Sequence, residues 1–142
     1  NSYSLDANAL VFAEDIFGAQ YFFDLRGNRR VVKMLNIDTG KTSLCSNNFE
    51  DFLEDVIIRC DFNSSLRDLA KRFLQQCNFD SLEFKHISYK VPLILGGSSV
   101  EIANMELVNS LTNLTLLGQI VAQAKKLPPG TKIDNFRIEN QN

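Results

Sequence analysis

The chain has 142 residues, 44% of them hydrophobic, and a formal net charge of -2 at pH 7. This length supports one compact domain, and the mild acidity argues against direct nucleic-acid binding, which needs a surplus of Lys and Arg on one surface. The opening segment NSYSLDANA has neither the basic nor the apolar part of a signal peptide, and the longest apolar runs are too short to span a bilayer. We therefore expect no membrane association.

The first half of the chain predicts an antiparallel meander of about four strands. Residues 9–13 and 21–25 are rich in aromatic and branched side chains, and Gly18 separates them. Residues 31–37 predict the next strand. The turn Asp38-Thr39-Gly40, whose glycine tolerates a positive φ, leads into a fourth strand over residues 41–45.

An amphipathic helix is predicted to follow the meander. Its apolar positions recur at the helical period, whereas acidic residues fill the opposite face. The apolar positions are Phe49, Phe52, Leu53, Val56 and Ile57, and the acidic ones are Glu50, Asp51, Glu54 and Asp55. Asn47, three residues before Glu50, has the spacing of a helix N-cap.

The second half predicts two more helices around an extended segment. The first covers residues 66–77, and Pro92 disfavours a central strand in the extended stretch that follows. The second uses apolar residues from Leu107 to Ala124 and stops before Pro128-Pro129-Gly130, after which residues 133–138 predict a short strand. The fold class is therefore α+β, an antiparallel β-sheet meander with about three helices packed against it.

The residues that carry chemistry form no recognisable catalytic motif. His86 is the only histidine and has no orienting partner nearby in sequence, so we expect a structural role for it. Cys45, Cys60 and Cys77 lack metal-ligand spacing, which favours reduced buried thiols in the cytoplasm. We expect no metal and no cofactor. A hydrolase that uses Cys45 or Cys77 with His86 is the enzymatic alternative.

Two short motifs have structural interpretations beside functional ones. Gly96-Gly97 lacks the lysine of a phosphate-binding loop, so a tight turn or a close backbone approach is the simpler explanation. Glu14 and Asp15 are neighbours at the end of a predicted strand, where adjacent side chains point to opposite faces. We expect Asp15 to accept backbone hydrogen bonds in the turn that follows.

Charge is segregated along the sequence. The basic residues Arg26, Arg29, Arg30 and Lys33 surround one hairpin. The acidic residues Asp51, Glu54 and Asp55 lie on one helix. Each group is consistent with a solvated surface, but an acidic helix face also fits the cationic groove of a nucleic-acid-processing protein.

Three segments together resemble the SUKH superfamily, whose founding member is a yeast cell-wall synthesis regulator. They are LVFAEDIFG at residues 10–18, the turn at 38–40, and SNNFEDFL at 46–53. The segment YKVPLILGG at residues 89–97 and the stretch 104–130 resemble a tail found in some bacterial members.

The resemblance implies a non-enzymatic domain over residues 1–142 without the N-terminal helical segment usual in the family. In bacteria such domains serve chiefly as immunity proteins that bind a cognate polymorphic toxin, often a nuclease. From charge and expected exposure, we predict that Asp51, Glu54 and Asp55 bind the partner, with Glu14 and Asp15 as second choices. The alternative is a small-molecule or peptide-binding regulatory domain, with a groove between the sheet and residues 91–100.

Overall fold

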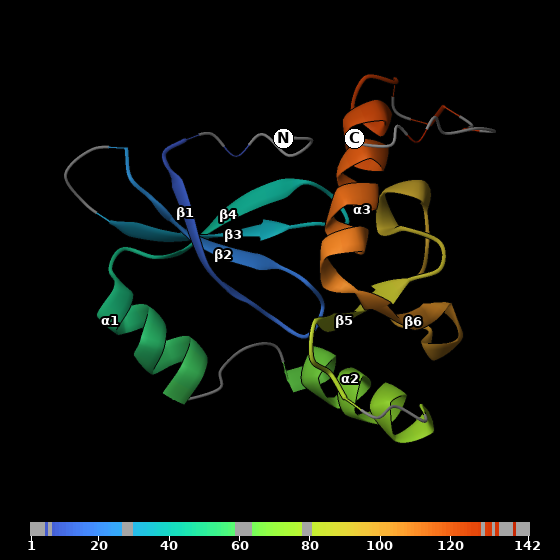
Figure 1. Ribbon diagram of the computed structural model, residues 1–142, viewed down its shortest axis with the longest axis horizontal. Helices are drawn as coiled ribbons and strands as arrows, with labels where there is room; N and C mark the ends of the chain where they lie inside the picture. The colour runs from blue at the N-terminus through green and yellow to red at the C-terminus, as the bar shows by residue number, and fades with distance from the viewer. Residues whose placement is uncertain are drawn as a thin grey trace.

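A computed structural model describes Leu5 and residues 7–26, 30–58, 64–77 and 81–128, together with positions 130, 131, 133 and 138. In these residues a four-stranded antiparallel sheet and a two-stranded antiparallel sheet are accompanied by three α-helices (Figure 1). The predicted α+β class and the meander are therefore confirmed. No helix in the described residues is long and apolar enough to cross a membrane.

The first sheet is the predicted meander, with each strand hydrogen-bonded to its neighbour in sequence. Gly18 and Gly40 have φ of +78° and +62°, so the turns around them use the left-handed backbone that glycine adopts without steric cost. The strands are β1 (Ala9–Glu14), β2 (Gln20–Asp24), β3 (Val31–Asn36) and β4 (Lys41–Ser46).

The first helix begins at Phe49, where the predicted amphipathic run begins, but its N-cap is one residue later than predicted. α1 (Phe49–Phe52) continues into the π-helix η1 (Leu53–Ile58), and Asn48 is its N-cap. The Asn48 side chain accepts a hydrogen bond from the Asp51 backbone N–H at 2.8 Å and donates to the Asp51 carboxylate at 2.6 Å. The predicted cap at Asn47 with Glu50 is therefore wrong. The two residues that bond to each other at this spacing are Asn48 and Asp51.

α2 (Ser64–Gln76) confirms the second predicted helix, although its expected cap at Asn63 lies outside the described residues. The third helix is shorter than predicted. α3 (Ser110–Ala124) begins after Asn109, whose side chain accepts a hydrogen bond from the Thr112 backbone N–H. The residues before this cap belong to a strand instead.

The second sheet pairs β5 (Lys85–Tyr89) with β6 (Met105–Asn109). Leu107 and Val108, predicted to be helical, lie in β6 opposite Ile87 and His86. Their apolar spacing fits a helix, but pairing with β5 satisfies the backbone groups of this segment. β5 itself confirms part of the stretch predicted to be extended.

The segment between β5 and β6 is compact rather than extended. Leu93–Leu95 forms the 3₁₀ turn η2, and Ile102–Asn104 forms another, η3. A Cβ on Gly97 would lie 1.8 Å from the Val91 carbonyl oxygen, which confirms the close backbone approach predicted for Gly96-Gly97. Of the last predicted strand, Ile133 and Ile138 are not in a strand, and residue 136 lies outside the described residues.

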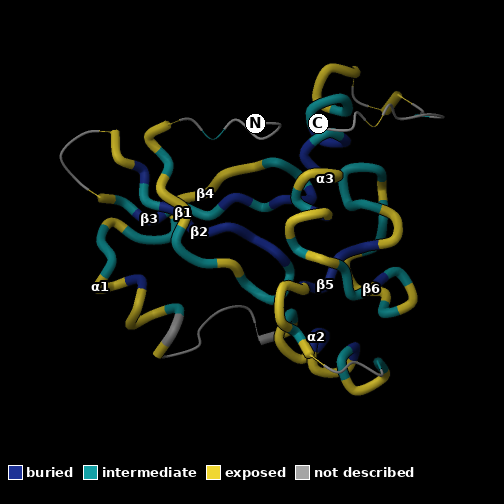
Figure 2. Tube along the Cα trace, viewed as in Figure 1, coloured by how far each residue is buried: buried dark blue, intermediate teal, exposed yellow. Residues whose placement is uncertain are grey.

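Buried residues lie on β2, β3, β5 and α3, among other elements (Figure 2), and they form three core clusters. Neighbouring residues Tyr21 and Phe22 on β2 point to opposite faces of the first sheet. Phe22 packs with Leu117 and Val121 of α3, and Tyr21 packs with Phe52 of α1, so these two helices cover opposite faces. A third cluster joins α2 to the second sheet through Leu69, Ala70, Phe73, Ile87, Tyr89 and Met105.

The two adjacent glycines give a matched test of the compact segment. Gly96 has φ +89° with nothing within 4 Å of an added Cβ, so Gly96→Ala should cost only the left-handed penalty of about 1–2 kcal/mol. Gly97→Ala forces a Cβ onto the Val91 backbone and should cost about 3 kcal/mol. Urea unfolding measures both losses. A smaller loss at Gly97 than at Gly96 would contradict the packing described.

Candidate functional site

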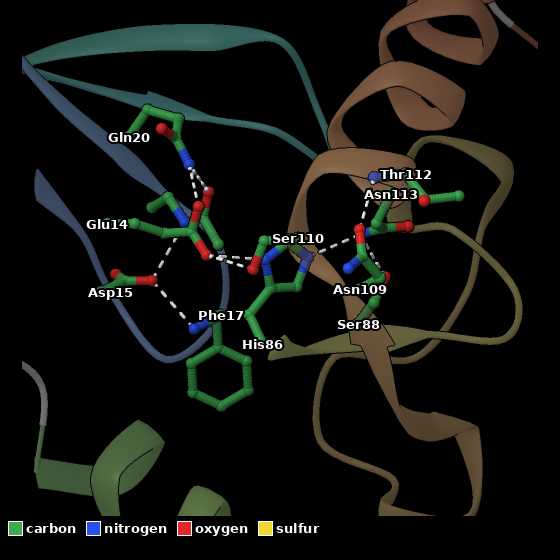
Figure 3. A network of polar contacts seen from close by, with 12 residues as sticks. Glu14, Asp15, Phe17, Gln20, His86, Ser88, Asn109, Ser110, Thr112 and Asn113 are labelled. Atoms are coloured by element: carbon green, nitrogen blue, oxygen red, sulfur yellow. Dashed lines mark hydrogen bonds and ion pairs between the residues drawn. The ribbon is translucent and has the colours of Figure 1, made fainter. Parts of the chain in front are cut away.

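A buried polar network centres on His86 of β5, whose side chain is only 1% exposed (Figure 3). Its Nδ1 lies 2.9 Å from Oε1 of Glu14, at the end of β1, and its Nε2 lies 2.7 Å from Nδ2 of Asn113 on α3. The Asn113 amide also donates to Oγ of Ser88 at 3.0 Å. Because the amide donates to Nε2, the ring proton is on Nδ1 and is donated to Glu14.

Glu14 is the acceptor at which this network converges. Besides the His86 ring, Gln20 Nε2 donates to its carboxylate at 2.7 Å and Ser110 Oγ donates at 2.8 Å. Burial raises the pKa of Glu14, but the hydrogen bonds from His86, Gln20 and Ser110 together outweigh burial and lower the pKa below its usual value. The carboxylate of β1 is thus held by groups from β2, β5 and α3.

A general base needs a ring nitrogen that can reach the proton it removes. Both nitrogens of His86 are hydrogen-bonded to protein groups, and the ring is buried. Neither Cys45 nor Cys77 is its partner, which removes the geometric support for the cysteine–histidine hydrolase. No group of three metal-ligating side chains occurs among the residues that the structure describes.

The cysteines are less buried than predicted. Cys45 and Cys77 are free thiols of intermediate exposure, and Cys60 lies outside the described residues. Burial raises the pKa of the Cys45 thiol, which favours the unreactive protonated form.

Asp15 occupies the turn after β1 as predicted. Its Oδ1 accepts hydrogen bonds from the backbone N–H groups of Phe17 and Ala19 at 2.9 and 3.0 Å. Burial raises the pKa of Asp15 even though these bonds oppose the shift. Glu14 and Asp15 therefore point to different partners and do not form an acid–base pair (Figure 3).

Asp38, in the turn between β3 and β4, is a buried carboxyl, whereas the sequence predicted it only as a residue of the turn. It is 4% exposed, and its Oδ1 has no hydrogen-bond partner among the residues that the structure describes. Burial, with a smaller contribution from the charge of Asp15, raises the pKa of Asp38 to about 6.

The three acids predicted to bind a partner lie on consecutive turns of one surface segment. Asp51 is on α1, Glu54 and Asp55 are on η1, and all three are exposed. The Asn48 cap fixes where this segment begins. The structure thus places the three acids on one surface segment, whereas Glu14 and Asp15 belong to the end of β1 and the turn after it.

The predicted basic group is partly neutralised. Arg26 and Lys33 both form ion pairs with Asp24, at 2.8 and 2.6 Å. Their hydrogen bonds hold the pKa of the Asp24 carboxyl well below its usual range. Arg30 is exposed, and residue 29 lies outside the described residues.

A cleft of about 400 Å³ lies between the turn after β1, the segment formed by α1 and η1, and α2. Its lining is mainly apolar, with Glu14 from the end of β1, Asp15 from the turn, and Arg67 and Lys71 from α2. This is not the groove expected beside residues 91–100. The apolar lining residues are Ala13, Ile16, Phe17, Tyr21, Phe52, Val56, Leu66, Ala70 and Leu74.

Comparison with models of known protein families finds none that matches this chain. No curated protein matches its sequence either. Membership of the SUKH superfamily therefore stays a prediction that depends on the three segments at residues 10–18, 38–40 and 46–53.

Asp38 predicts a pH dependence of stability. The pKa of this carboxyl is about 6 in the folded chain and 3.8 ordinarily, so its contribution to stability is present below pH 3.8 and is lost as the pH rises through 6. Asp38→Asn should therefore raise the free energy of unfolding by about 2–3 kcal/mol at pH 8 and leave it nearly unchanged at pH 3.5. Urea unfolding at both pH values measures this difference.

The control is Asp68→Asn, which removes one exposed carboxylate from α2. Its effect should stay within about 0.5 kcal/mol at both pH values. If Asp38→Asn changed the free energy of unfolding equally at pH 3.5 and pH 8, burial of the Asp38 charge would not be the cause of the change.

Proposed function

We propose that this chain is a non-enzymatic recognition domain that binds a cognate protein toxin in the cytoplasm and neutralises it. This is the immunity role that the resemblance to the SUKH superfamily implies. The observation that supports it is a contrast between the inside and the surface. The only histidine is buried in a hydrogen-bonded network, whereas Asp51, Glu54 and Asp55 are exposed together on α1 and η1.

Electrostatics supports a basic partner for this surface. A nuclease presents cationic side chains where it binds phosphates, and an acidic surface of complementary shape competes for that groove. Phe49 and Phe52 of α1 pack in edge-to-face contact with Phe12 of the sheet, with ring centroids 5.4 and 5.6 Å apart. The acids therefore lie on a segment that packs against the core, so this segment loses little conformational entropy on binding.

Glu14 and Asp15 have a different place in this proposal. They line the cleft rather than the acidic surface, and their carboxylates already accept hydrogen bonds within the chain. A partner that contacts them would do so through the cleft.

The second candidate function is a small-molecule or peptide-binding regulatory domain. The cleft beside α2 favours it, since a mainly apolar cavity with a few charged groups at its edge is the usual form of a ligand site. The two functions differ in the surface they use, so variants on the two surfaces separate them.

Charge reversal on the acidic surface tests the first function. Asp51→Asn, Glu54→Lys and Asp55→Lys are combined, because asparagine at position 51 keeps a hydrogen-bonding group beside the Asn48 cap. Binding is measured by surface plasmon resonance against the C-terminal domain of the protein encoded directly upstream, which is where the immunity role predicts the toxin. The triple variant should bind at least about tenfold more weakly, mainly through slower association at low salt.

The matched control applies the same change of charge elsewhere, with Asp68→Asn, Glu101→Lys and Glu106→Lys at exposed positions. Its affinity should stay near that of the original chain. Equal losses in the two triple variants would reject the acidic surface as the binding site, and no binding by the original chain would reject the immunity role.

A further inference from the structure

We propose that the cleft between the β1–β2 turn, the α1–η1 segment and α2 binds a small amphipathic carboxylate, with the apolar part inside and the carboxylate on Arg67 and Lys71. This inference rests on the second candidate function and names its ligand class. Figure 1 shows the three elements that surround the cleft.

The cleft is suited to the apolar part of such a ligand. Its volume of about 400 Å³ lies within the range of small-molecule sites, which is roughly 300–1,000 Å³. Its walls come from three separate elements, with Phe17 from the turn, Phe52 from α1 and Leu74 from α2 among the apolar lining. Filling it with a hydrocarbon chain would remove apolar surface from water on both partners.

One edge of α2 supplies the site for the carboxylate. Leu66, Ala70 and Leu74 recur once per turn along the cleft, and Arg67 and Lys71 each follow the apolar residue by one position. Residues four apart are neighbours on a helix surface, so one carboxylate can reach both cations. Among the described residues, neither cation has a hydrogen-bonding or ion-pairing partner for its side chain, and both are exposed.

The side of the cleft opposite α2 determines the orientation of the ligand. Glu14 at the end of β1 and Asp15 in the β1–β2 turn line the cleft, and like charge there disfavours a carboxylate. An anionic group is therefore directed toward α2, and the hydrocarbon chain lies toward Phe17 and Tyr21.

Three ligands test the proposal on the full chain by isothermal titration calorimetry and ¹H–¹⁵N NMR. Decanoate, used below its micelle concentration, should bind saturably with one site and perturb the amide signals of Phe17, Leu66 and Ala70. Acetate lacks the hydrocarbon chain and decyltrimethylammonium reverses the charge, so each should bind at least tenfold more weakly. No saturable decanoate binding, or equal binding of the ammonium ligand, would overturn the proposal.

Arg67→Gln with Lys71→Gln should weaken decanoate at least tenfold. The control, Arg72→Gln with Lys126→Gln, removes two exposed cations that do not line the cleft and should leave the affinity within twofold. Equal effects of the two double variants would overturn the proposal, as would binding only of an acidic peptide or of anionic vesicles. Toxin binding measured on the same variants reports separately on the first function, because it depends on the acidic surface.

Discussion

The contact between the Glu14 carboxylate and the His86 ring is the interaction on which the arrangement of the two sheets depends. It joins the end of β1 to the first half of β5, and Asn113 and Ser110 bring α3 to the same centre. Each such hydrogen bond is worth about 1 kcal/mol net, but a partner left buried and unpaired costs about 1–3 kcal/mol. Removal of any one group therefore leaves its partners unpaired in the interior, so the loss of stability exceeds that of a single hydrogen bond.

The turn at Gly18 makes this contact possible. A Cβ at that position would lie 2.6 Å from Cε1 of the His86 ring and 2.7 Å from Cδ1 of Ile37. The backbone of the turn also reaches the second sheet, because the Ile87 N–H donates to the Ile16 carbonyl at 2.8 Å. The same turn holds Asp15 and lines the cleft, so one loop positions both the buried centre and the candidate ligand site.

Local patterns in the sequence predicted most of the first sheet and two of the helices, because alternation, turn glycines and helical periodicity are properties of neighbouring residues. The same patterns misplaced Leu107 and Val108, whose spacing continues that of α3 although they pair with β5. The Glu14–His86 contact spans 72 residues, and no local pattern encodes it. The cleft was missed for the same reason, since its walls come together only when the β1–β2 turn meets α1 and α2.

His86 is a buried structural group whose ring proton lies on Nδ1. Long-range ¹H–¹⁵N correlation NMR of the imidazole measures this directly at neutral pH. We expect one slowly exchanging proton on Nδ1, hydrogen-bonded to Glu14, and an unprotonated Nε2 that accepts from Asn113. A ring protonated at Nε2, or one that averages between tautomers and exchanges rapidly with water, would contradict it.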